Sequence, residues 1–185
     1  MSFQVHTTTS APSQSQPILE SIDQTFGFLP NIFGVLAESP TALQAYTSIM
    51  ESMKHSKLSP IEQQVAILTV STYNGCTYCV AAHSTVAGMV KMPDTILNEL
   101  RAQQPLSDPK LEALRTFTLS VVNHRGWVPQ EDILAFANAG YEKGHILEVL
   151  TLVAQKTLSN YVNHIAHTPL DAQFSSQRWD PPHSS

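Results

Sequence analysis

The chain has 185 residues, a length typical of one domain with a substantial hydrophobic core. Its formal net charge at pH 7 is -5 and no basic patch is visible, which argues against nucleic acid and anionic membranes as partners. Only 14% of the residues are charged, against roughly 25% in a typical soluble protein. This low fraction predicts that part of the surface is buried between copies of the chain in a homo-oligomer.

The N-terminal sequence does not predict a secretory signal, because it has no positively charged start followed by an apolar run. The longest apolar runs, such as VAIL, are too short to span a bilayer. We therefore expect a soluble, cytoplasmic protein that binds no membrane. In a reducing compartment, closely spaced cysteines more often serve catalysis or metal binding than a permanent disulfide.

The two ends of the chain differ in composition from its middle. Residues 1–16 are rich in Ser, Thr and Gln without periodicity, and predict a mobile N-terminal arm. The final residues 172–185 contain two adjacent prolines and many small polar residues, and predict a C-terminal tail. Residues 17–171 are then a single helical domain.

Helices are predicted along the whole middle of the chain. Three of them share one start signal, a capping residue followed by proline, at Ser39-Pro40, Ser59-Pro60 and Asp108-Pro109. No segment alternates between apolar and polar residues in the manner of a strand. The sequence therefore predicts an all-α fold. In chain order, the predicted helices cover residues 31–37, 40–56, 60–73, 77–89, 93–103, 109–124, 130–139 and 143–167.

The segment with the most distinctive chemistry is NGCTYCVAAHS, residues 74–84, which holds the only two cysteines of the sequence. The Asn-Gly pair ends one helix and leaves Cys76 near the start of the next. At 100° per residue, Cys76, Cys79 and His83 fall within about 60° of one another on one helix face. Cys79 and His83 are also an i, i+4 pair, close enough to interact.

This arrangement suits thiol redox chemistry. A helix N-terminus stabilises a thiolate through its dipole and its unpaired N–H groups. An adjacent histidine can accept the thiol proton or, once charged, stabilise the anion. A second cysteine one turn away can capture an oxidised sulfur as a disulfide, which completes a cycle of thiolate, sulfenic acid, disulfide and reduction.

Other interpretations of the same residues remain open. The cysteines can be ordinary buried residues, or two ligands of a zinc site in which His83 and another histidine complete the set. Against zinc, the sequence has no second Cys/His pair with the usual spacing, although His164 and His167 are an i, i+3 pair. Covalent haem is excluded, because Val80 follows the second cysteine where a histidine is needed.

The stretch EQQVAILTVSTYNGCTYCVAAHS resembles the core of the alkylhydroperoxidase D-like (AhpD-like) proteins of the carboxymuconolactone decarboxylase superfamily. FGFLPNIFGVLAESP and NYVNHIAHTPLD are similar to a peroxidase-related branch of that group. The resemblance implies an AhpD-like helical bundle with a helix–CxxC–helix core, assembled as a dimer, trimer or hexamer. It also implies reduction of hydrogen peroxide or organic hydroperoxides without a cofactor or metal, and recharging by an external lipoyl- or thioredoxin-like dithiol carrier.

The resemblance also implies roles for individual residues. Cys76 and Cys79 match the redox pair, with Cys79 favoured as the peroxidatic cysteine and Cys76 as the resolving one, and His83 matches the family's base. In many other C-x-x-C proteins the first cysteine attacks, so both assignments stay open. Asn160 and Asn163 on the last helix can also approach the site, as can His164, although a polar helix end explains them equally well.

The chain departs from the family pattern at the glutamate twelve residues before the first cysteine. Gln64 stands there, and glutamine cannot pass a proton as a carboxylate does. The nearest acid is Glu62, which also fits a capping box with Ser59 at the start of its helix. Both Gln64 and Glu62 are therefore candidate site residues. Tyr78, between the cysteines, stands where some members have histidine, and it can serve packing or supply a hydroxyl.

Three functions follow from these observations. The leading hypothesis is a thiol-dependent peroxidase in antioxidant defence. A carboxymuconolactone decarboxylase-like lyase is the second, although that reaction does not need a dithiol. The third is a zinc-binding or redox-sensing interaction protein.

Overall fold

The computed structural model describes residues 2–182; Met1 and residues 183–185, the outer ends of the predicted arm and tail, lie outside it. The described chain contains helices and no strand, which confirms the predicted all-α fold. Among these residues, no helix combines the length and apolarity needed to cross a bilayer. The elements are α1 (Gln16–Phe26), α2 (Asn31–Leu36), α3 (Pro40–Met53), α4 (Pro60–Tyr73), α5 (Thr77–Met89), α6 (Asp94–Arg101), α7 (Pro109–Asn123), α8 (Gln130–Asn138), α9 (Lys143–Ala166) and the 3-10 helix η1 (Ala172–Gln177).

The three proline-started helices begin where the sequence predicts them. In each, the residue before the proline caps the helix, since the side chains of Ser39, Ser59 and Asp108 accept hydrogen bonds from backbone N–H groups of the first turn. The helix α1 was missed: its Ser15 N-cap makes no side-chain cap bond, and its sequence is mostly polar. Its packing against the rest of the chain therefore stabilises it more than local signals do.

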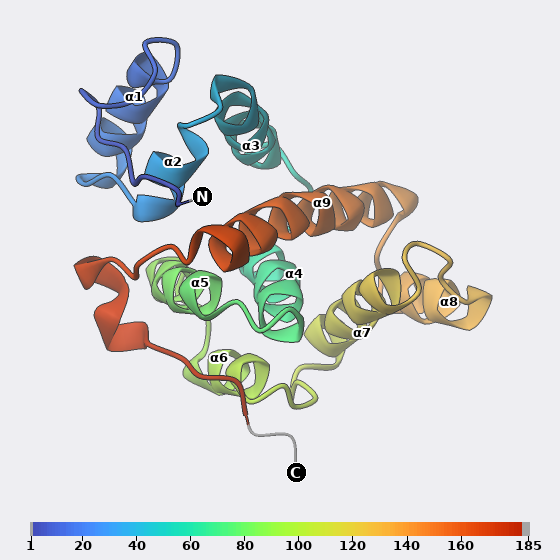
Figure 1. Ribbon diagram of the computed structural model, residues 1–185. Coiled ribbons are helices and arrows are strands. Elements are labelled where there is room, and N and C mark those ends of the chain that lie inside the picture. Colours follow the sequence, from blue (N-terminus) through green and yellow to red (C-terminus); the bar gives the residue numbers. More distant parts are fainter. Residues whose placement is uncertain (1, 183–185) are drawn as a thin grey trace.

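Helix α4 lies at the centre of the molecule, and α5, α7 and α9 pack around it. In Figure 1, α9 runs across the molecule, with α1, α2 and α3 toward one of its ends and α7 and α8 toward the other. One cluster of buried apolar side chains joins α4 to α6, α7 and α8, and a second joins α1, α2 and α3 to the start of α5. Both cysteines belong to the second cluster.

The N-terminal segment differs from the expected mobile arm, because its described part packs against α2. The His6 backbone N–H donates to the Gly34 carbonyl at 3.1 Å, and the Ser15 hydroxyl donates to the Ala37 carbonyl at 2.8 Å. A Cβ at Gly34 would lie 2.6 Å from the His6 carbonyl oxygen, so a side chain there would displace the segment. A polar composition did not predict this packing, because it depends on hydrogen bonds to carbonyl groups of α2 and its C-cap, which lie more than 20 residues away in the sequence.

The described part of the C-terminal tail packs on the body of the molecule. Phe174 of η1 and Trp179 are buried, and η1 lies against α5. The Trp179 ring N–H donates to the Arg101 carbonyl at 2.9 Å, while the Arg101 guanidinium donates to the carbonyls of Gln177 and Arg178. Prolines do end helical structure here, but two buried aromatic rings hold the segment in place.

Candidate active site

The turn between α4 and α5 places the two cysteines. Gly75 has a φ of 64°, the left-handed conformation that glycine adopts without strain, and so it reverses the chain directly before Cys76. The Cys76 N–H donates to the Ser71 carbonyl at 2.9 Å, and Cys76 is the N-cap of α5. Cys79 follows in the first turn of the helix. Both cysteines are buried and free thiols.

The two sulfurs have opposite shifts in pKa. A hydrogen bond to Cys79 raises the pKa of the Cys76 thiol, and burial adds to this. Burial also acts to raise the pKa of Cys79, but the Cys76 hydrogen bond, the positive charge of Lys156 and a hydrogen bond from Asn163 outweigh it and lower the pKa to about 5. At neutral pH, Cys79 is therefore the thiolate and Cys76 is the thiol that donates to it.

The side-chain amide of Asn163 binds both sulfurs from α9. Its Nδ2 donates to the Cys79 sulfur at 3.2 Å and approaches the Cys76 sulfur at 3.9 Å. Asn160 lies nearby and accepts from the Asn74 amide at 2.9 Å, whereas His164 is exposed. Of the three polar α9 residues named from the sequence, Asn163 contacts the dithiol most closely, and Asn160 also helps to lower the pKa of Cys79.

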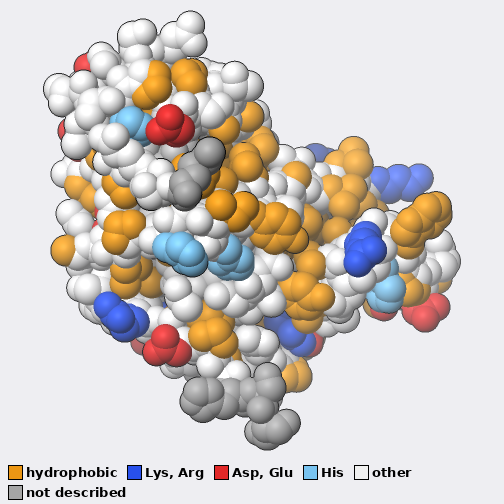
Figure 2. Space-filling model, in the orientation of Figure 1, with side chains coloured by type: hydrophobic (Ala, Val, Ile, Leu, Met, Phe, Trp, Pro, Cys, Tyr) orange, Lys and Arg blue, Asp and Glu red, His pale blue; other side chains and the backbone are white. Residues whose placement is uncertain are grey.

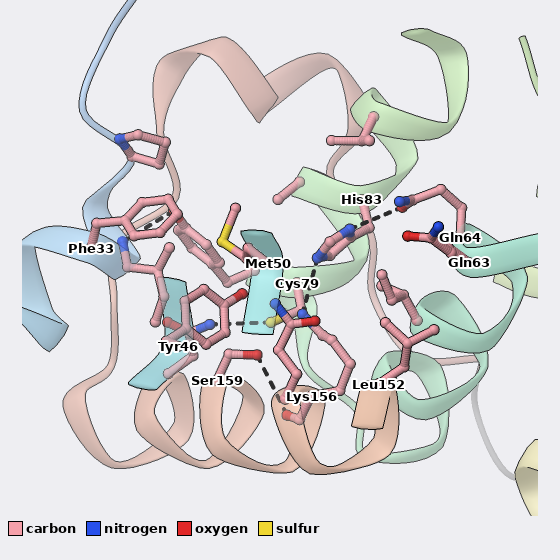
Figure 3. A pocket seen from close by; sticks show the side chains of 18 of the residues that line it. Phe33, Tyr46, Met50, Gln63, Gln64, Cys79, His83, Leu152, Lys156 and Ser159 are labelled. Atoms are coloured by element: carbon pink, nitrogen blue, oxygen red, sulfur yellow. Dashed lines mark hydrogen bonds between the residues drawn. The ribbon is translucent and has the colours of Figure 1, made fainter. Parts of the chain in front are cut away.

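His83 lies beside the dithiol, between Gln64 and Lys156 (Figure 3). Burial lowers the pKa of the imidazole, and the neighbouring Lys156 charge lowers it further, so the ring is neutral. The Lys156 ammonium donates to His83 Nε2 at 3.0 Å, and His83 Nδ1–H then donates to Gln64 Oε1 at 3.0 Å. The structure brings His83 and Gln64 to the site, but it directs the lone pair of the ring to Lys156.

Lys156 is a site residue that the sequence analysis missed. Its side chain is 1% exposed, and the charge of Cys79 keeps the pKa of its ammonium above the ordinary value although burial opposes this. A signal was present in the sequence, because a lysine stands in the buried stripe of α9 that includes Leu152, Ser159 and Asn163. Lysine is almost never fully buried unless it is paired, so that position indicates a function.

A pocket of about 230 Å³ opens onto Cys79, His83 and Lys156. Apolar and aromatic side chains form most of its wall, and Figure 3 shows Phe33, Tyr46 and Met50 on the side opposite His83. The pocket therefore offers a reactive sulfur and a buried cation to a mostly apolar ligand. Its further lining includes Phe26, Ile32, Met53, Ile67, Tyr78, Ala82, Val86, Leu152, Asn163 and Phe174.

The structure does not bring Glu62 to this pocket. Its carboxylate accepts from the Ser59 N–H at 2.8 Å and completes the capping box of α4. It also pairs with Lys110 at 2.9 Å and accepts from the Tyr141 hydroxyl at 3.0 Å. Burial raises the pKa of Glu62, but these partners outweigh it and hold the pKa at about 2. These contacts make Glu62 a cap of α4, as in the second interpretation of this residue, and they lie away from the pocket.

Replacing Glu62 with glutamine is expected to destabilise the fold and leave thiol chemistry unchanged. The substitution removes the charge that Lys110, Ser59 and Tyr141 bond, at a cost of about 1–3 kcal/mol in the free energy of unfolding. Urea denaturation measures this cost, and the alkylation rate of Cys79 provides the control. A Glu62→Gln protein with normal stability and a slowed thiol would show that Glu62 acts in the site.

Tyr78 anchors the site helix to two other segments. Its hydroxyl donates to the Asp171 carboxylate at 2.6 Å and accepts from the Ile32 backbone N–H at 3.3 Å. Asp171 in turn accepts from the Asn31 N–H at 3.1 Å. The hydroxyl is thus occupied away from the sulfurs, and the packing interpretation of Tyr78 is the one that these contacts support.

The zinc interpretation lacks a ligand set. Within residues 2–182, no three His, Cys, Asp or Glu side chains converge as a metal site would need. His83, the expected third ligand, uses both ring nitrogens on Gln64 and Lys156.

The chain is similar to known proteins in one segment of its sequence and in its fold. Residues 40–106 match the Carboxymuconolactone decarboxylase family. A peroxidase-related protein from Ralstonia eutropha JMP134, described as an alkylhydroperoxidase AhpD core, is 20% identical with a TM-score of 0.84 over 93% of both chains. A peroxidase-related protein from Silicibacter sp. TM1040 is 19% identical, with a TM-score of 0.78 over 94% of this chain and 93% of its own.

A debrominase, Bmp8, shares the same fold. A variant of it in complex with 2,3,4-tribromopyrrole is 20% identical, with a TM-score of 0.68 over 89% of both chains. None of the curated proteins compared with the sequence matches it. The family match covers the segment that carries both cysteines and His83, and the shared fold extends over nearly the whole chain. Residues 40–106 are therefore similar to the Carboxymuconolactone decarboxylase family, and the chain as a whole shares the fold of the AhpD-like proteins.

Proposed function

We propose that the protein is a thiol-dependent peroxidase that reduces hydroperoxides through Cys79 and Cys76. The observation that carries this proposal is the unequal dithiol: a buried Cys79 thiolate lies at an apolar pocket and accepts a hydrogen bond from the Cys76 thiol. An attacking thiolate with a resolving thiol already beside it is the arrangement that two-electron peroxide reduction needs.

The reaction has two steps. The Cys79 thiolate attacks the terminal oxygen of the hydroperoxide, the O–O bond breaks, and an alcohol and a Cys79 sulfenic acid form. Cys76 then attacks the sulfenic sulfur, forms the Cys76–Cys79 disulfide and expels water. An external lipoyl- or thioredoxin-like dithiol reduces the disulfide and restores the pair.

The pocket favours organic hydroperoxides over hydrogen peroxide. Its aromatic and aliphatic wall can bury an alkyl or aryl group, which hydrogen peroxide lacks. Asn163 lines the same pocket, and its buried Oδ1 has no hydrogen-bond partner among the described residues. This oxygen can accept the O–H of a bound hydroperoxide and align the terminal oxygen with the sulfur.

Intact mass spectrometry tests the proposal directly. One equivalent of cumene hydroperoxide should lower the mass of the reduced chain by about two hydrogens, through an intramolecular disulfide. Non-reducing gels should show no disulfide-linked dimer of chains. A main product made of linked dimers, or no reaction with any hydroperoxide, would exclude this function.

Filling the pocket with a larger side chain is expected to slow the reaction with large hydroperoxides more than the reaction with hydrogen peroxide. Ala82 lies on α5 within the pocket wall. Ala82→Phe should lower the rate of oxidation by cumene hydroperoxide by at least about tenfold, because the added ring occupies the space for the aryl group. Stopped-flow kinetics should show a smaller change with hydrogen peroxide. Ala82→Ser is the matched control, and equal losses with both peroxides would argue against this binding site.

Reductive dehalogenation is a second candidate, favoured by the aromatic wall of the pocket and by the fold shared with a debrominase. In that reaction the two thiols supply two electrons, the carbon–halogen bond takes them and one proton, and halide leaves as the disulfide forms. Bromide release from a bromopyrrole would support it. A lyase activity has no comparable support, because it leaves the unequal dithiol without a role.

The proposal also includes the assembly of the protein as a homo-oligomer and its location in the cell. Exposed apolar side chains on α9, at Leu147, Leu150, Tyr161 and Ile165, support the proposed homo-oligomer. In Figure 2 apolar side chains gather across the middle of the visible face, where Figure 1 places α9. We propose that the protein acts in the cytoplasm, where reducing carriers are present.

A further inference from the structure

Lys156 is a buried cation without a carboxylate partner. Its side chain is 1% exposed, and none of the ion pairs among the described residues includes it. Removing an ammonium from water costs several kcal/mol unless an anion offsets it. The titratable groups that face it are the two thiols and His83 around the start of α5, and the phenol of Tyr46 on α3. Of the two thiols, Cys79 carries the negative charge at neutral pH.

The neutral imidazole of His83 cannot supply a proton at this place. Its Nε2 lone pair accepts from Lys156, and its Nδ1–H is directed to Gln64 on the other side of the ring. Gln64 thereby fixes the tautomer that presents a lone pair to Lys156. Of His83 and Lys156, it is therefore the ammonium that can deliver a proton to the pocket, while the Cys76 proton is directed to Cys79.

We propose that Lys156 is the proton carrier of the dithiol cycle: it pairs with the Cys79 thiolate, protonates the leaving oxygen, and then deprotonates Cys76. This inference rests on the proposed peroxidase function. It assigns a catalytic residue outside the C-x-x-C segment and explains why a glutamine suffices at position 64. When the ammonium of Lys156 supplies the proton, position 64 has only to hold the His83 ring in place. A glutamine can do this, and a carboxylate that takes up a proton is not needed.

The steps balance in atoms and charge. The Cys79 thiolate attacks the hydroperoxide, and the Lys156 ammonium gives one proton to the departing alkoxide, which leaves sulfenic acid, alcohol and a neutral amine. The amine takes the Cys76 proton, the new thiolate attacks the sulfenic sulfur, and the expelled hydroxide regains that proton as water. The two sulfurs lose two electrons and the peroxide gains them. The disulfide form then holds a neutral Lys156, so neither state buries an unpaired charge.

Two substitutions distinguish the effect of the Lys156 charge on the pKa of Cys79 from the effect of its transferable proton on the oxidation rate. Lys156→Met is similar in length and neutral, so the pKa of Cys79 should rise toward about 8.5, and the rate of oxidation by cumene hydroperoxide should fall by about 10²–10⁴-fold. Lys156→Arg keeps the charge but cannot give up a proton, so the pKa of Cys79 should stay low while the oxidation rate still falls. Lys143→Met, on the exposed start of the same helix, is the control.

The readouts are the pH dependence of Cys79 alkylation in a Cys76→Ser background and single-turnover stopped-flow oxidation, with circular dichroism to confirm folding. A folded Lys156→Met protein whose thiol pKa and oxidation rate match the unsubstituted chain would overturn the inference. An unsubstituted chain that alkylates at low pH but ignores every hydroperoxide would instead overturn the proposed function, while the Lys156–Cys79 pair would stand.

A second experiment does not depend on the variants: it measures how many protons the unsubstituted chain takes up from solution during oxidation. This experiment tests the inference even if the Lys156 variants do not fold. When the reduced thiolate form reacts with one equivalent of hydroperoxide in weak buffer, a pH indicator should show no net proton uptake, because Lys156 supplies the proton. The ultraviolet absorbance of the thiolate confirms the starting state. Uptake of one proton per chain would mean that Lys156 stays charged in the disulfide form, and the inference would be wrong.

Discussion

Replacing Cys79 with serine is expected to lower the rate of reaction with hydroperoxide by about 10³-fold or more. In the unsubstituted chain the hydrogen bond to Cys79 and then burial raise the pKa of Cys76; the substitution removes the first cause, but burial remains, so Cys76 still offers little thiolate at neutral pH. A serine hydroxyl at position 79 is a far weaker nucleophile than a thiolate whose pKa is about 5. The measurement is the rate of thiol oxidation followed by stopped flow and intact mass.

Cys76→Ser is the matched variant for this experiment. It keeps the attacking thiolate and removes the resolving thiol, so a first oxidation should still occur and stop at a Cys79 sulfenic acid that dimedone traps. In that variant the alkylation rate should rise through a midpoint well below the value of about 8.5 for a free thiol, since Lys156 and Asn163 remain. If Cys79→Ser reacts normally and Cys76→Ser does not, the two roles are reversed.

Replacing Phe136 with alanine is expected to cause the largest loss of stability, about 3–5 kcal/mol in the free energy of unfolding. Phe136 is 1% exposed and is stacked between two rings, with its centroid 4.3 Å from that of Phe117 and 4.3 Å from that of Tyr141. Its removal leaves a cavity between α7 and α8 and loosens Tyr141, which bonds the Glu62 cap. Urea or guanidinium denaturation measures the loss.

Leu134→Ala on the same helix provides the comparison, because Leu134 is 53% exposed and should change stability by about 0.5 kcal/mol or less. Neither residue lines the pocket, so the alkylation rate of Cys79 should stay normal in both folded variants. Equal destabilisation by the two substitutions would show that the stacked rings do not hold α8 in place.

Local signals in the sequence determined most of the secondary structure. Ser39-Pro40, Ser59-Pro60 and Asp108-Pro109 locate helix starts because each N-cap bonds N–H groups only two or three residues away. The dithiol segment is equally local, since a helix start two residues after Asn74-Gly75 places Cys76 and Cys79 at its first turn. The capping interpretation of Glu62 was available for the same reason.

Tertiary structure alone decided which charged group serves the site. Lys156 is 77 residues from Cys79 in the sequence, and only the packing of α9 against α4 and α5 brings its ammonium to His83 and near enough to Cys79 for the two charges to interact. The packing of α4 against α5 likewise makes Gln64 a partner of the His83 ring. Other tertiary contacts hold the two end segments, through the Gly34 backbone on α2 and through the buried ring of Trp179 against α6. Helix caps act over one turn and can be read from neighbours in sequence, whereas the pKa of a buried thiol depends on charges that distant segments bring within a few ångströms.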